Sequence, residues 1–145
     1  MAGTDSTPVF VKDGQYLSFT ADAAITVGDV VELTTTGTDT CTVGTVADDA
    51  TTYLGVAVGG DRFSRTSTDD EIAAGQKVTV CTRGVVRVYT GTSAILIGSA
   101  LEAGAAGIVE LAGTNGTAGH TNSYIGYALD ANGSAATTIR MKLIR

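Results

Sequence analysis

The sequence predicts an all-β protein, a small β-barrel or sandwich made of two similar halves with an extended N-terminal arm. Three observations predict this class. Hydrophobic residues make up 43% of the 145 residues and Gly reaches 19, a composition typical of strands joined by turns rather than of disordered chains. Short segments alternate between apolar and polar residues with the two-residue period of half-buried strands. Several of these segments also occur twice.

The arm covers residues 1–15 and contains the only proline, Pro8, which is followed by Val9, Phe10 and Val11. Because proline lacks an amide hydrogen and favours extended geometry in its neighbour, this segment is expected to be extended. It can add a strand to a neighbouring subunit or form the first strand of its own domain. Both interpretations remain open.

A single β domain is expected over residues 16–145, with its first half at about 16–91. An alternating strand comes first, and the turn signal Gly28-Asp29 then precedes a second strand. Further along, residues 62–76 form the most polar segment, expected to be an exposed loop in which one helical turn could form. Residues 77–91 alternate on both sides of Gly84, which predicts a bulge where the strand changes sheet.

The second half, about 92–145, repeats the first. Three pairs of segments correspond: AITVGDVVEL (24–33) with AILIGSALEA (94–103), YLGVAV (53–58) with YIGYAL (124–129), and KVTVCTR (77–83) with TIRMKLI (138–144). One half has too few strands to hide its apolar face, so the two halves are expected to cover each other. The expected core is Ile25, Val30, Leu33, Leu54, Val56, Val78, Val80, Ile95, Leu101, Ile125, Leu129, Ile139, Met141 and Leu143.

Charge and hydropathy bear on the classes of partner. The net charge is −6, and the basic residues are scattered along the sequence apart from a loose group at its end. Nucleic-acid binders gather Lys and Arg on one face to neutralise phosphates, so nucleic acid is not an expected partner. No apolar run is long enough to span a bilayer, and the first residues lack the features of a secretory signal. We expect a soluble protein made in the cytoplasm, with no membrane partner.

Candidate residues for chemistry are few, and we expect no enzyme, no cofactor and no metal. His120 lies in a glycine-rich segment, a poor place to hold a catalytic base. Neither Asp48-Asp49 nor Asp69-Asp70-Glu71 has the spacing of a calcium loop. The two cysteines, Cys41 and Cys81, are too few and too far apart for a metal site, and we interpret them as buried free thiols.

The order of these segments resembles that of the capsid cement, or head decoration, proteins of tailed bacteriophages and related viruses. The likeness covers nearly the whole chain. The matching residues are Ile25, Gly28, Asp29 and Val31; Gly55, Val56 and Ala57; Ala73, Ala74, Gly75, Val78 and Val80; and Arg83, Gly84, Val85 and Val88. Residues 62–71 and 114–123 are longer than such proteins need.

The resemblance implies a tulip-like β fold and a structural role. It implies a homotrimer that binds the major capsid protein on the outer surface of the mature head and braces it against genome pressure. Because each copy in a trimer adds a contact with the shell, multivalency would make the attachment durable even if each contact is weak. We expect Pro8, Val9, Phe10 and Val11 to contact the capsid or a neighbouring subunit. The trimer contact is expected at Val86, Val88 and Tyr89.

Two alternatives belong to other classes. A carbohydrate- or cell-surface-binding β-module of a virion or adhesin should present clustered exposed aromatic residues, and the five tyrosines here mostly fall within strand patterns. A small barrel attached to an enzyme would need a catalytic partner domain.

Overall fold

The computed structural model of the chain describes residues 12–34, 37–43, 53–60, 71–112 and 124–144. These residues form an all-β fold, as the sequence predicts. One short 3-10 turn, η2, spans Ala105–Gly107. The strands are β1 (Lys12–Ala21), β2 (Ile25–Thr26), β3 (Val30–Leu33), β4 (Thr40–Val43), β5 (Tyr53–Gly60), β6 (Glu71–Ile72), β7 (Lys77–Tyr89), β8 (Ala100–Ala103), β9 (Val109–Leu111), β10 (Tyr124–Ala128) and β11 (Thr138–Leu143).

The first lobe is a closed ring of five strands. Its order is β1-β4-β3-β5-β7, and β7 pairs back to β1. Pairing is antiparallel except between β1 and β4, where Thr20 and Ala21 lie parallel to Thr40 and Cys41. Closing the ring satisfies the backbone groups that an edge strand would expose.

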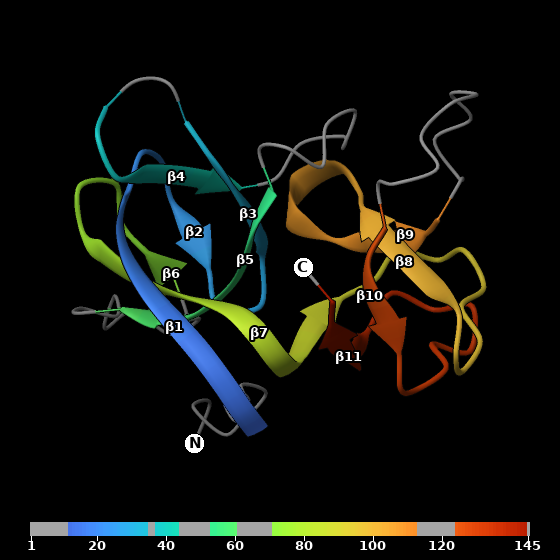
Figure 1. Cartoon of the computed structure of the whole chain (residues 1–145). Helices are drawn as coiled ribbons and strands as arrows, with labels where there is room; N and C mark the ends of the chain where they lie inside the picture. The colour runs from blue at the N-terminus through green and yellow to red at the C-terminus, as the bar shows by residue number, and fades with distance from the viewer. Residues whose placement is uncertain (1–11, 35–36, 44–52, 61–70, 113–123, 145) are drawn as a thin grey trace, which may run out of the picture.

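The second lobe has the same order of strands. The second half of β7 pairs with β11, followed by β10, β8 and β9. A single parallel bridge from Thr90 to Val109 returns to the end of β7. Figure 1 shows the two lobes side by side, with β7 running from one into the other.

Gly84 is the point at which β7 changes partners, as the sequence predicts. Residues before it pair mainly with β1 and β5, and residues from it onward pair with β11. Its φ of +122° is readily accessible only to glycine. The resulting bend lets one strand of 13 residues serve two lobes.

The registers of the two lobes match pair for pair. The corresponding pairs are Val31↔Gly55 with Leu101↔Gly126, Leu33↔Cys41 with Ala103↔Val109, Ala57↔Val80 with Ala128↔Met141, and Thr20↔Lys77 with Tyr89↔Thr138. Hydrogen bonding at the repeated turn matches too, because Gly28 N–H donates to Ala57 O and Gly98 N–H donates to Ala128 O, both at 2.8 Å.

Two clusters of buried side chains form the core, one mainly in each lobe. Most of the predicted core residues are buried. The exceptions are Leu33, which is exposed at the end of β3, and the half-buried Leu54 and Leu129.

The helical turn that the sequence allows near residue 71 is not found in the described part of this segment, residues 71–76. Glu71 and Ile72 form strand β6, which pairs with β2. Ile72 lies opposite Ile25, and both side chains are fully buried. This tertiary contact outweighs the local preference for a helical N-terminus.

Candidate interaction surfaces

The structure divides the expected trimer-contact residues between two faces of β7. Val86 and Val88 point into the core and are fully buried, so their side chains offer no surface to a second chain. Tyr89 lies on the other face and is half-buried, and a contact there stays a prediction. The expected capsid-contact residues, Pro8, Val9, Phe10 and Val11, lie outside the described residues.

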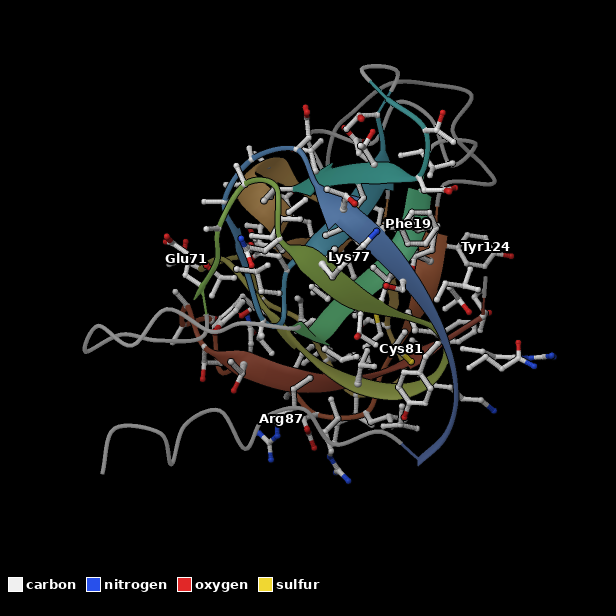
Figure 2. All side chains as sticks on the ribbon, turned by 90° about the vertical axis from the view of Figure 1, so that its left-hand side faces the viewer. Phe19, Glu71, Lys77, Cys81, Arg87 and Tyr124 are labelled. Carbon is white, nitrogen blue, oxygen red and sulfur yellow. The ribbon has the colours of Figure 1, made fainter. Side chains whose placement is uncertain are left out.

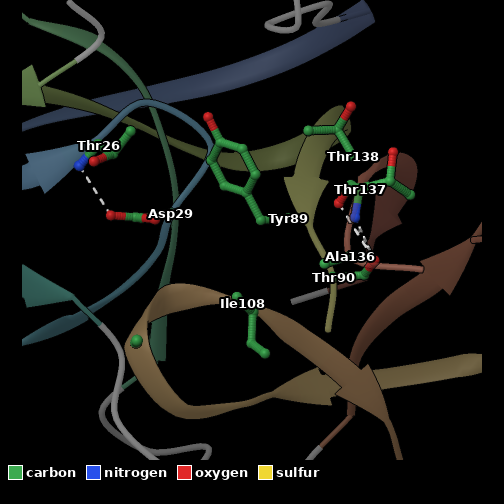
Figure 3. A pocket seen from close by; sticks show the side chains of 9 residues that line it. Thr26, Asp29, Tyr89, Thr90, Ile108, Ala136, Thr137 and Thr138 are labelled. Atoms are coloured by element: carbon green, nitrogen blue, oxygen red, sulfur yellow. Dashed lines mark hydrogen bonds between the residues drawn. The ribbon is translucent and has the colours of Figure 1, made fainter. Parts of the chain in front are cut away.

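A pocket of about 610 Å³ lies between the lobes. The first lobe contributes Thr26 and Asp29 from the repeated turn. The second lobe contributes the remaining lining residues: Tyr89, Thr90, Ala106, Ile108, Ala136, Thr137 and Thr138. Figure 3 shows the Tyr89 side chain projecting between the Asp29 side and the Thr138 side of this pocket. Most of the lining side chains are small and neutral, and Asp29 supplies the carboxylate of the pocket.

Asp29 is an almost fully buried carboxylate, with 8% of its surface exposed. Its Oδ2 accepts a hydrogen bond of 2.8 Å from Thr26 N–H (Figure 3), which closes the turn. Its Oδ1 lies so close to Gly107 of the second lobe that a Cβ there would come within 2.8 Å of it. Burial raises the pKa of Asp29 to about 6, although the bond from Thr26 opposes this rise.

The second lobe closes the same turn with serine. Ser99 occupies the position of Asp29, and its Oγ accepts a hydrogen bond of 3.2 Å from Leu96 N–H. A neutral hydroxyl therefore suffices for the turn, and the charge of Asp29 is not required by it.

The thiols cannot easily act as nucleophiles. Cys41 and Cys81 are both free and buried, as interpreted from the sequence. Burial raises the pKa of Cys41 to about 11 and also raises that of Cys81, so both remain protonated near neutral pH. Among the described residues, no three His, Cys, Asp or Glu side chains form a group that could hold a metal ion. His120, Asp48-Asp49 and Asp69-Asp70 lie outside these residues.

An exposed apolar turn and a pair of tyrosine rings are features of the described surface that a partner could contact. Leu96 and Ile97, at the turn of the second lobe, are 70% and 72% exposed, whereas the equivalent Val27 is buried. Tyr124 and Tyr127 on β10 form a tilted ring pair with centroids 6.2 Å apart. Within the described part of the chain, no helix has the length and apolar character needed to cross a membrane.

The comparisons with known proteins agree with this picture. The family profile described as phage cement protein matches residues 11–143. The chain belongs to the phage cement protein family. This membership supports a role in capsid decoration and a location on the virion capsid, and it points to a structural rather than a catalytic protein. No curated protein sequence matches the chain significantly.

Among solved structures, this cement protein is similar to the N base of head fiber gp8.5 in bacteriophage phi29. The TM-score is 0.51 at 12% sequence identity, over 90% of this chain and 93% of the other. At this identity the likeness concerns the fold alone. The match to the family profile confirms the family resemblance inferred from the turn and strand motifs.

Proposed function

We propose that this cement protein binds the outer surface of the mature phage head as a homotrimer, attaches to the major capsid protein and braces the shell against genome pressure. The observation that carries the proposal is the family match over residues 11–143. The fold is suited to the task, because the two lobes share β7 and the closed ring of the first lobe leaves no unpaired strand edge there.

We also propose that residues 1–15 act as an arm and that the two lobes arose by duplication within one domain. The matched registers support duplication, and β7, which belongs to both lobes, would be the strand at which the copies join. Pro8, Val9, Phe10 and Val11 would supply the apolar part of the arm, adding a strand to a neighbouring sheet.

The test mixes purified protein with undecorated shells of its phage and measures bound protein by sedimentation. Light scattering gives the mass of the free protein, and the heating temperature at which shells release DNA gives the bracing effect. We expect a trimer, saturable attachment and more heat-resistant shells. Attachment without any gain in resistance would contradict bracing, and a monomer that attaches fully would contradict the trimer.

A second variant tests the arm. Deleting residues 1–11 leaves the described strands complete, since β1 begins at Lys12, so the β-sheet circular dichroism should be unchanged. We expect attachment to be lost. Attachment at the wild-type level would remove the arm from the proposal.

A further inference from the structure

The basic side chains of the second lobe gather on one face of the sheet. On β7 and β11, Val86, Val88, Ile139, Met141 and Leu143 are buried, so the alternate residues face outward. Arg87 lies directly opposite Arg140, and Lys142 lies opposite Val85. Arg83 is exposed just before the bend at Gly84. We call Arg83, Arg87, Arg140 and Lys142 the basic face.

The backbone at the start of β1 lies beside this face. Lys12 pairs with Val85 from the side opposite to β11. Five basic side chains are described, and four of them form the basic face. The fifth, Lys77, lies elsewhere, near the far end of β1, where its Nζ donates to Thr20 Oγ1 at 3.1 Å. Figure 2 shows Arg87 at one side of the molecule, well apart from Lys77 and Glu71. The net charge of the chain is −6, yet among the described side chains positive charge is concentrated in one place.

This arrangement is unfavourable for the isolated fold. Like charges directly opposite each other in an antiparallel pair destabilise a sheet, and Arg87 faces Arg140. Asp130 offsets part of the repulsion, because its Oδ1 lies 2.7 Å from Arg140 Nη2. Both arginines lower the pKa of Asp130, Arg140 mainly by hydrogen bonding, to about 2.

The first lobe shows that the fold does not need this charge. By the matched registers, Ser18 and Thr79 occupy the places of Arg87 and Arg140. Both are neutral, and they form the same pair of strands. The positive charge is therefore a property that the second lobe has gained beyond the requirements of folding.

We infer that the basic face is the side through which this protein docks on the capsid shell, against a surface rich in carboxylates. This inference rests on the proposed function. Charge complementarity favours an acidic partner. The proposed arm favours the shell as that partner, because residues 1–11 join the described chain at Lys12, whose backbone pairs with Val85 beside the basic face. The proposed arm and the basic face would then engage the same surface, the arm by apolar contact and the face by ion pairs.

The experiment measures attachment to undecorated shells between about 50 and 500 mM salt. The variant Arg87→Glu with Lys142→Glu reverses the charges of the half-buried Arg87 and the exposed Lys142 and leaves both residues of the Asp130–Arg140 pair in place. Lys77→Glu is the control. Since a close interfacial ion pair contributes about tenfold or more in affinity, we expect the double variant to bind at least about 100-fold more weakly. The control should stay within about twofold. Arg87→Lys, which keeps the charge, should bind nearly as the wild type does.

Binding of the wild type should weaken steeply with salt, and the double variant should lose much of this dependence. Unchanged circular dichroism and a melting temperature no lower than that of the wild type exclude misfolding. Arg87→Gln with Lys142→Gln removes both ion pairs without adding repulsion and is expected to bind about 100-fold more weakly. If the wild type binds shells but both double variants bind equally well, the basic face is excluded while the proposed function stands. If the wild type itself fails to bind, the proposed function and this inference both fail.

Two other partners give different results. If the double variant loses trimer mass in light scattering, the face contacts a second copy and the inference is wrong. Salt-sensitive binding of a duplex DNA oligonucleotide that the double variant abolishes, together with unchanged shell binding, would assign the face to nucleic acid instead.

Discussion

Replacing Asp29 by serine should remove the pH dependence of the free energy of unfolding that the titration of this buried carboxyl causes. Serine is the natural choice because Ser99 closes the equivalent turn, so the variant keeps an acceptor for Thr26 N–H. The pKa of Asp29 rises from an ordinary 3.8 to about 6 on folding. At 1.36 kcal/mol for each pH unit, this difference corresponds to about 3 kcal/mol.

The sign follows from proton binding. Between pH 3.8 and about 6, the folded protein holds a proton on Asp29 that the unfolded chain has released. Stability therefore falls as the pH rises through this window, and the full cost is present above about pH 6. Asp130 has the opposite effect in a separate window, because its lowered pKa of about 2 costs stability only in stronger acid.

The assay is urea unfolding of the wild type and of Asp29→Ser at pH 4, 5, 6 and 7. Because every other titrating group is common to both proteins, subtracting the two curves isolates Asp29. We expect the variant to gain about 2 kcal/mol relative to the wild type between pH 4 and pH 7, since part of the total cost is already present at pH 4. Asp29→Asn, which keeps the shape of the side chain, should behave alike. Parallel curves for wild type and variants would refute the burial argument, as would a directly measured pKa near 3.8 for Asp29.

Two further predictions concern packing and a buried amide. A methyl group at Gly55 would overlap the carbonyl oxygen of Cys81 on β7. Gly55→Ala should therefore destabilise the fold by about 3 kcal/mol and lower the melting temperature by roughly 9 °C. Gly91→Ala is the control, because a methyl group there would make only an ordinary contact with Ile108, and it should melt as the wild type does. The buried Asn132 side chain accepts from Ile95 N–H at 2.9 Å and donates to Ser93 O at 2.7 Å, so Asn132→Ala should cost about 3 kcal/mol and speed hydrogen exchange at the Ile95 amide. Wild-type exchange at that amide would contradict this role.

The strands could be predicted from the sequence because their signals are local. Two-residue alternation and glycine turns place the chain segments, and the repeat of "Ile-x-x-Gly" marks equivalent turns before either is seen. Alternation also defines two faces of a strand, but it does not say which face is buried. This is why Val86 and Val88 were expected at a subunit contact and are found in the core.

The interaction surfaces could not be predicted because they depend on register and on lobe placement. Asp29 is part of a turn signal in the sequence, and the approach of Gly107 from the second lobe helps to make it a buried pocket residue. The basic residues look scattered in the sequence, yet the antiparallel register of β7 with β11 sets Arg87 against Arg140. The two-residue alternation alone could have placed each basic residue on the outer face of its own strand. It could not have shown that these residues lie on the same face of the sheet.

The two lobes serve as controls for each other. Where they agree, as in the turns at Gly28 and Gly98, the feature is required by the shared pattern of strand pairing. Where the lobes differ, and the feature of one lobe destabilises the free protein, the requirements of folding do not explain that feature. A pair of facing arginines replaces a neutral pair, and the exposed Leu96-Ile97 replaces Thr26-Val27, of which Val27 is buried. Charge repulsion and exposed apolar surface both cost free energy in the free protein, and both costs are relieved when a partner covers them. The second lobe therefore carries the features that a docking role would select, while the first lobe shows what the fold requires without them.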